Sequence, residues 1–267
     1  MFKIGHCRYF DCEISIKYAL DSISHYDLVV LTTHSPRPDE PTDNSYDLVC
    51  EYIKNHPERK FIHEIYPHIV YPAFHPYYKS NYPNIDSVNT IANYYNFGLR
   101  IIRNFIIENK LNYNDIMYAK IDSDIIELEG ETFYKNNEWK LKNYITNRSP
   151  IIHYMICDDK TVKVRPSDFN LKRSDYFTLP GKILPYFFYK QKQLWEEIFI
   201  TPSCPHNLTR IRSKLVQQQS FIHVAEPEHY FSKRGYDESK WVNCENYPAI
   251  IDKIKDDYFK NRSTFIL

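Results

Sequence analysis

Glycine is scarce in this sequence, which has 5 glycines among 267 residues. The chain contains neither GxGxxG nor GxxxxGK followed by Ser or Thr, so a Rossmann cofactor site and a P-loop are both disfavoured. It also has no GxSxG, the turn that presents the nucleophile of many serine hydrolases. Glycine-based phosphate binding and serine hydrolysis are therefore poor explanations for this chain.

An excess of charge is also missing, since Lys+Arg and Asp+Glu both number 34. General nucleic-acid binding needs a basic excess, so we expect no nucleic-acid partner. No apolar run approaches the roughly 20 residues of a membrane helix, and residues 1–8 lack the apolar region of a signal peptide. We therefore expect a cytoplasmic protein, with room for peripheral contact at the inner face of the membrane.

Zinc-type cysteine spacing is absent as well. No pair of the six cysteines forms CxxC, so we expect free thiols and no zinc site. The cysteines are Cys7, Cys12, Cys50, Cys157, Cys204 and Cys244.

The first half of the chain alternates strand-like and helix-like patterns. Strands are expected at 2–8, 27–33, 60–65 and 117–121, and helices at 11–24, 46–55 and 88–109. The aromatic, Pro-rich stretch at 67–83 is too irregular for an element. The order β-α-β-α-β-α-β predicts an α/β fold with a central, mostly parallel sheet flanked by helices.

The pattern changes after residue 127. We expect helices at 131–144, 191–199 and 252–260, and a hairpin formed by 151–157 and 161–164. The polar and basic stretch 201–220 is expected in a loop or in a helix beside the site. No linker divides the sequence, so we expect one domain over residues 1–267.

Two acids follow the fourth expected strand, in the run Lys120-Ile121-Asp122-Ser123-Asp124. Buried carboxylates are costly unless a cation accompanies them. In an extended segment residues i and i+2 point the same way, so Asp122 and Asp124 are expected to face one ligand. Carboxylates suit Mg²⁺ or Mn²⁺, often completed by substrate phosphates. The alternative is a surface turn with two solvated acids.

With these residues in view, the chain resembles the GT-A glycosyltransferases, especially the family 2-like group with a DxD motif. The resemblance covers about residues 1–130. It rests on the acid motif and on four further segments, which are Arg8 after the first strand, Leu20-Asp21-Ser22-Ile23, Asp27-Leu28-Val29-Val30-Leu31 and Asn96-Phe97-Gly98-Leu99.

The resemblance implies a nucleotide diphosphate sugar donor, a Mn²⁺ or Mg²⁺ cofactor and a glycan or glycolipid acceptor. Residues 1–130 would bind the donor and 131–267 the acceptor. Carried over by position, Asp122 would contact the nucleoside or sugar and Asp124 the metal, with Arg8 on the donor. The family often has a base-reading acid after the second strand, where this chain has Thr32-Thr33-His34-Ser35.

An inverting transferase needs a carboxylate that takes the proton of the acceptor hydroxyl. Glu196 and Glu197, beside Trp195, are the first candidates, and an exposed helix face is the alternative. Asp158 and Asp159 are the second candidates, with a hairpin turn as the alternative.

Downstream residues offer further ligands. His223 is a candidate third metal ligand, although a structural histidine is the stronger reading. Arg212, with Arg210 and Lys214, would bind a diphosphate, because a guanidinium group forms bidentate hydrogen bonds with phosphate oxygens. A solvated loop is the alternative for these three residues.

Together these features and the resemblance predict a metal-dependent glycosyltransferase of the hexosyltransferase type. The resemblance alone implies a product in surface polysaccharide or lipopolysaccharide synthesis. Two other classes remain open. One is another metal-dependent phosphoryl enzyme, a nucleotidyltransferase or nuclease, and the other is a non-catalytic carbohydrate-binding protein. The absence of a glycine-rich phosphate loop disfavours a nucleotidyltransferase, and the neutral charge balance disfavours a nuclease.

Overall fold

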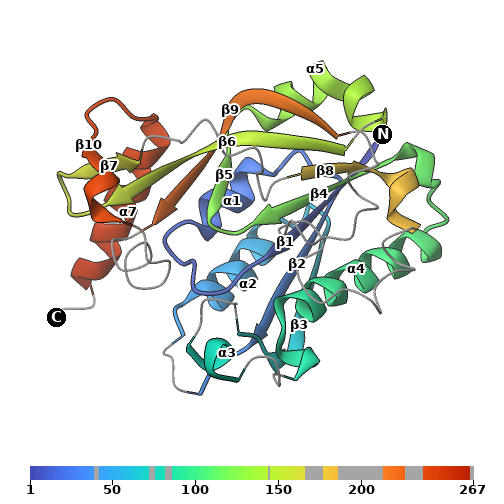
Figure 1. Cartoon of the computed structure of the whole chain (residues 1–267), viewed down its shortest axis with the longest axis horizontal. Helices are drawn as coiled ribbons and strands as arrows, with labels where there is room; N and C mark the ends of the chain where they lie inside the picture. The colour runs from blue at the N-terminus through green and yellow to red at the C-terminus, as the bar shows by residue number, and fades with distance from the viewer. Residues whose placement is uncertain are drawn as a thin grey trace.

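The protein is described from a computed structural model of the chain (Figure 1). The residues described are 1–38, 42–71, 76–81, 86–143, 145–165, 177–185, 213–225 and 237–264. Within these ranges the strands form one ten-stranded sheet, and helices lie against its faces. The predicted α/β class is confirmed.

The first half of the chain alternates strands and helices in the predicted order. Its elements are β1 Phe2–Arg8, α1 Ile16–Ser22, β2 Leu28–Ser35, α2 Ser45–Asn55, β3 Phe61–Ile69, α3 Pro76–Asn81, α4 Ile91–Glu108 and β4 Ile116–Asp122. The four strands lie in the order β4-β1-β2-β3, and every pairing among them is parallel. Their carboxyl ends therefore share one edge, which is where open α/β sheets bind ligands.

The second half extends the same sheet with mainly antiparallel pairings. Its elements are β5 Ile125–Glu127, α5 Gly130–Asn143, β6 Ile145–Ile156, β7 Val162–Arg165, β8 Phe177–Pro180, β9 Ser213–Ala225, β10 Val242–Asn243 and α7 Ala249–Thr264. β8 is antiparallel to both β4 and β6, and β5 is antiparallel to β9, whereas β6 and β9 are parallel. The sheet is therefore mixed, with its parallel part in the first half.

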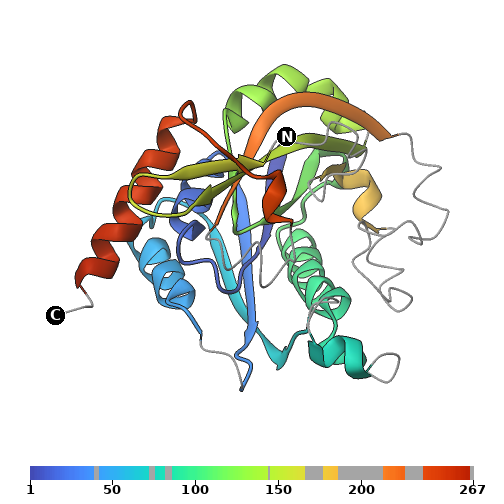
Figure 2. The same cartoon turned by 60° about the vertical axis from the view of Figure 1, so that its left-hand side comes forward.

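Helices cover both faces of the parallel strands. The 3.6-residue period of α4 buries Leu99 and Ile102 against Ile4, Val30 and Tyr118 of the sheet. The neighbouring strand positions point to the other face, where they pack with α1, α2 and α5. Figure 2 shows α4 and α2 on opposite sides of these strands. Among the described helices, none has both the length and the apolar composition to cross a bilayer.

Three local expectations were wrong. α1 begins at Ile16 rather than near residue 11, because the preceding residues form a loop at the end of β1. The stretch 67–83 contains the end of β3 and helix α3. Residues 213–220 belong to β9, since pairing with distant β6 determines their conformation despite a polar sequence. The helix expected at 191–199 lies outside the described residues.

Candidate functional site

β4 brings the acid motif to the carboxyl edge of the parallel strands. Residues 116–121 are buried, the strand ends at Asp122, and Ser123 with Asp124 forms a turn into β5. The expectation that both acids lie on one extended segment was therefore wrong, because the chain turns between them. The relative direction of the two carboxylates is determined by this turn and not by strand alternation.

Two cations contact the Asp122 carboxylate. In the parallel register of β1 and β4, Arg8 lies beside Asp122 and His6 beside Lys120. The Arg8 Nη2 atom is 3.2 Å from Asp122 Oδ1, and the Lys120 Nζ atom is 3.6 Å from Oδ2. The side chains of Lys120, Arg8 and Asp122 are 1%, 11% and 25% exposed. Both oxygens of Asp122 thus have a cationic neighbour in a poorly solvated place.

A buried polar network lies beneath Arg8. The Arg8 guanidinium carbon is 5.3 Å from the centre of the Tyr95 ring on α4, which favours the cation. The Tyr95 and Tyr118 hydroxyls are hydrogen-bonded to each other, and Tyr118 also bonds His6 Nδ1 at 3.1 Å. Burial, reinforced by Arg8 and Lys120, lowers the pKa of His6 to about 3, so its imidazole is neutral.

Gly98 of α4 leaves room for the His6 ring. A β-carbon at this position would lie 2.0 Å from His6 Nε2, which no packing tolerates. The glycine of the segment Asn96-Phe97-Gly98-Leu99 therefore allows close approach of α4 to β1, and through it the placement of His6 and Tyr118.

The loop between β1 and α1 contacts the backbone of the acid motif on the side away from Arg8 and Lys120, through a hydrogen bond from Ser15 to Ser123. The Ser15 hydroxyl donates to the Ser123 carbonyl at 3.4 Å, and the Cys12 amide donates to Ser45 Oγ at 2.8 Å. Asp11 adopts a left-handed backbone with φ 49°, an uncommon conformation that often marks functional loops. Burial raises the pKa of the Cys12 thiol to about 12, so this thiol is protonated and no nucleophile.

The acid motif suits a metal ion whose coordination is completed by substrate oxygens, and it does not form a closed site made of protein ligands alone. Among the described residues, no group of three or more His, Cys, Asp and Glu side chains is arranged to hold a metal. Mg²⁺ often uses only one or two carboxylates together with substrate phosphates. Asp124, half-buried at the turn, is the carboxylate that would hold such an ion, since Asp122 is engaged by Arg8 and Lys120.

The backbone places His223 close to the acid motif. In the antiparallel register of β5 and β9, His223 lies opposite Ile125, which follows Asp124 directly. The same residue lies beside His153 in the parallel register of β6 and β9. Its role as a metal ligand stays a prediction.

The candidates for the catalytic base have different outcomes. Glu196, Glu197 and Arg212 lie outside the described residues, so their roles remain predictions. Asp158 lies in the turn between β6 and β7, where its Oδ1 atom accepts hydrogen bonds from the amides of Lys160 and Thr161 at 2.8 and 2.7 Å. The predicted hairpin is confirmed, and Asp158 has a structural task in its turn.

A group of aromatic and basic side chains, which sequence reasoning did not assemble into a site, lies at the ends of β1 and β2 and at the start of α4. The rings of Phe10 and His34 are stacked, with centroids 3.9 Å apart and an interplanar angle of 18°. The Arg37 guanidinium carbon is 4.8 Å from the Phe10 ring centre, and its Nε donates to the Val70 carbonyl at 2.9 Å. Tyr94 packs edge-on against His34 and donates to the Thr32 carbonyl. We call Phe10, His34, Arg37 and Tyr94 the aromatic cluster.

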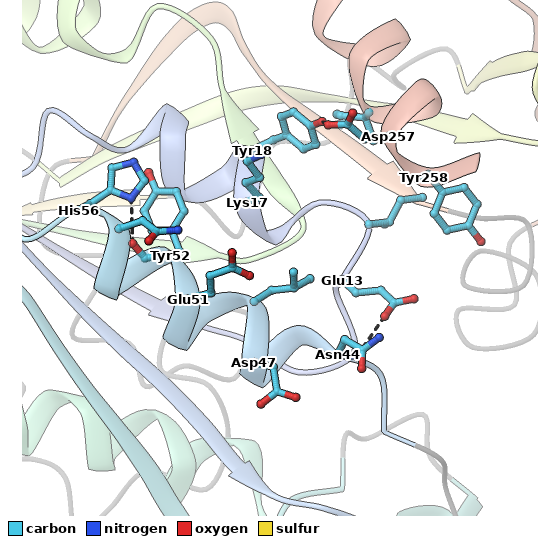
Figure 3. Close-up of a pocket in the computed structure, with 14 residues that line it drawn as sticks. Glu13, Lys17, Tyr18, Asn44, Asp47, Glu51, Tyr52, His56, Asp257 and Tyr258 are labelled. Carbon is cyan, nitrogen blue, oxygen red and sulfur yellow. Dashed lines mark hydrogen bonds between the residues drawn. The ribbon is translucent and has the colours of Figure 1, made fainter. Parts of the chain in front are cut away.

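A separate groove of about 620 Å³ lies between α1, α2 and α7 (Figure 3). Its lining includes the carboxylates of Glu13, Asp47, Glu51 and Asp257, and the Tyr18 hydroxyl donates to Asp257. None of Arg8, Lys120, Asp122 and Asp124 lines this groove. The groove is therefore a feature of the helical face, distinct from the acid motif.

No model of a protein family matches the chain, and no curated protein matches its sequence. Among solved structures, the chain is similar to 4-diphosphocytidyl-2C-methyl-D-erythritol synthase from Anaerococcus prevotii, with 11% identity, coverage of 82% of this chain and 89% of that one, and a TM-score of 0.43. It is similar to S. aureus TarS 1–349 at 11% identity, with 87% of this chain and 63% of that one covered and a TM-score of 0.44.

A third similar structure is a putative glucose-1-phosphate thymidylyltransferase from Bacillus anthracis, at 10% identity, with 83% of this chain and 88% of that one covered and a TM-score of 0.42. The chain thus spans 63% of the TarS fragment and most of the other two chains. At these values the similarities do not assign a function to this chain.

Proposed function

We propose that this protein is a metal-dependent glycosyltransferase, which moves a sugar from a nucleoside diphosphate sugar to a glycan acceptor. The observation that carries the proposal is the acid motif at the carboxyl edge of β4, with Arg8 of the neighbouring β1 paired to Asp122. This is the edge at which parallel α/β sheets receive ligands. The site combines a carboxylate for a metal, Asp124, with a cation for a phosphorylated substrate.

Asp124 is proposed to hold a Mn²⁺ or Mg²⁺ ion, whose positive charge stabilises the departing nucleoside diphosphate. Asp122 is proposed to accept hydrogen bonds from the donor, in a position determined by Arg8 and Lys120. Arg8, whose side chain is 11% exposed, is proposed to bind a donor phosphate through its guanidinium at the edge of the sheet.

The aromatic cluster is proposed to bind the nucleobase. A planar base stacks favourably on aromatic rings and on guanidinium planes. Phe10 and Arg37 are partly exposed beyond the ends of β1 and β2, and the buried His34 ring is stacked on that of Phe10. The cluster lies where the family often has a base-reading acid, so this chain would recognise its base mainly by stacking.

Residues 131–267 are proposed to bind the acceptor and to supply the catalytic base. Glu196 or Glu197 is proposed to deprotonate the acceptor hydroxyl if the reaction inverts the anomeric carbon. The proposed product is a surface polysaccharide or lipopolysaccharide, made in the cytoplasm with peripheral contact at the membrane. These proposals follow from the resemblance of residues 1–130 to the GT-A glycosyltransferases.

A thermal-shift panel tests the proposal. The full chain is heated with UDP, GDP, CDP and dTDP, with the matching nucleoside triphosphates and nucleotide sugars, and with free glycans, each with and without Mn²⁺. A ligand present at 100 times its Kd raises the free energy of unfolding by about 2.7 kcal/mol. We expect one base to give this response in the presence of Mn²⁺, and Asp124→Ala to abolish it. Asp159→Ala, which changes an exposed acid in the β6–β7 turn, should respond like the wild type.

Three outcomes would overturn the proposal. A response unchanged by Asp124→Ala would remove the acid motif from the site. A response to a nucleoside triphosphate, followed by release of pyrophosphate, would indicate a nucleotidyltransferase. No response to any nucleotide, together with binding of a free glycan, would indicate a non-catalytic carbohydrate-binding protein.

A further inference from the structure

We propose that Lys120, together with Arg8, withholds Asp122 from the metal, so that Asp124 binds the ion weakly until the donor diphosphate completes its coordination. Lys120 is thus a positioning residue that makes metal binding depend on the nucleotide. The inference rests on the proposed function, because it assumes a metal and a nucleoside diphosphate at the acid motif.

Strand geometry puts Lys120 and Asp122 on the same face of the sheet. They are two residues apart in β4, and their partners His6 and Arg8 are two residues apart in β1. Side chains at i and i+2 of a strand point the same way. The Lys120 Nζ therefore lies beneath the Asp122 carboxylate, 3.6 Å from Oδ2, while Arg8 approaches Oδ1 at 3.2 Å.

Burial makes this arrangement difficult to rearrange. The Lys120 side chain is 1% exposed, so its ammonium depends on protein groups in place of water. Moving Asp122 towards a metal would lose its attraction to a buried cation, which is unfavourable where water is scarce. The ion pair with Lys120 therefore favours the present position of Asp122.

The two cations also act directly on an incoming ion. A divalent cation at Asp122 would sit close to Arg8 and Lys120, and like charges repel strongly where water is excluded. Asp124 is on the turn after β4, beyond the strand positions that these two cations occupy. The diphosphate would bring the negative charge and the oxygen ligands that one carboxylate does not supply.

The first experiment measures Mn²⁺ binding without nucleotide, from the electron paramagnetic resonance signal of free Mn²⁺. Lys120→Met removes one cation and releases Asp122 Oδ2. We expect it to bind Mn²⁺ about tenfold more tightly than the wild type, because a neighbouring charge shifts such equilibria by a factor of ten or more. A merely structural lysine would, on replacement, lower stability without raising metal affinity.

Lys255→Met is the matched control. Lys255 is also a poorly exposed lysine in an ion pair, with Asp252 on α7 at 3.2 Å, and its ammonium bonds Asp252 and the Tyr247 hydroxyl. Its Mn²⁺ affinity should equal that of the wild type. An unchanged or weaker affinity in Lys120→Met would overturn the inference.

Arg8→Met keeps the inference testable if Lys120→Met fails to fold. Because it releases Asp122 Oδ1 and removes the other cation, this variant should also bind Mn²⁺ alone more tightly than the wild type, and an unchanged or weaker affinity would overturn the inference. Failure of the proposed function has a different signature, since the wild type would then show no joint stabilisation by Mn²⁺ with UDP, GDP, CDP or dTDP.

Discussion

At the scale of single residues, His6 connects the chemistry of the site to the stability of the protein. Its ring is fully buried between β1 and α4, it bonds the Tyr118 hydroxyl, and its pKa is lowered to about 3, first by burial and then by Arg8 and Lys120. A protonated imidazole would add a third positive charge to this face of the sheet. The neutral ring is thus what allows two cations to remain beside Asp122.

The pKa of His6 predicts how stability depends on pH. The unfolded chain takes up a proton near pH 6.5, whereas the folded state does so only near pH 3. Between these values the unfolded state binds more protons than the folded state. The contribution of neutral His6 to the free energy of unfolding is therefore fully present above pH 6.5 and is lost as the pH falls towards 3. The contribution is about 1.4 kcal/mol per pH unit. Urea unfolding at pH 7 and pH 5 measures this loss.

The variant His6→Gln should reduce the difference in stability between pH 7 and pH 5, even though it lowers stability at both. His68→Gln, which replaces an exposed histidine on β3, should leave the difference unchanged. Equal pH dependence in the wild type and in His6→Gln would mean that His6 is not the titrating group.

At the scale of elements, the β6–β7 hairpin gives Asp158 a structural role in place of the role of catalytic base. Asp158 accepts two backbone hydrogen bonds across the turn, and these bonds lower the pKa of its carboxyl. Asp158→Ala should therefore lower the melting temperature by a few degrees and leave nucleotide binding intact. Differential scanning calorimetry and the nucleotide panel measure the two effects.

The neighbouring acid is the natural control for this hairpin. Asp159 is exposed in the same turn and makes none of the hydrogen bonds that Asp158 makes. Asp159→Ala should preserve the melting temperature. Loss of turnover in Asp158→Ala at unchanged stability would reverse this assignment and restore Asp158 as a candidate base.

At the scale of the whole molecule, one sheet joins the proposed donor and acceptor halves. β4 of the first half is paired with β8, and β5 is paired with β9. Cutting the chain after residue 130 would expose both edges, and exposed strand edges favour aggregation over folding. The division at residue 130 is therefore expected to be one of function and not of folding.

We predict that a fragment of residues 1–130 does not fold by itself, while the full chain unfolds in one cooperative transition. The fragment should show poorly dispersed amide resonances and no unfolding transition in urea. Cooperative unfolding of the fragment, with dispersed resonances, would instead establish two independent folding units.

The sequence by itself determined the elements whose signals are local. The apolar runs of β1, β2 and β4 and the 3.6-residue period of α4 predicted the ends of these elements within three residues. The position of Asp122 at the end of a buried strand followed from the same pattern. These patterns are formed by residues close together in the sequence. They arise because one face of a helix, or both faces of a central strand, are buried.

Only the tertiary structure decided what surrounds the acids. Arg8 is 114 residues away from Asp122 in sequence, and the parallel register of β1 and β4 brings the two together. The sequence places Lys120 two positions before Asp122, but it does not show that Lys120 is buried, because that burial depends on packing with α4 and β1. The aromatic cluster and the strand β9 likewise arise from contacts between distant segments, whose energies are absent from any local pattern.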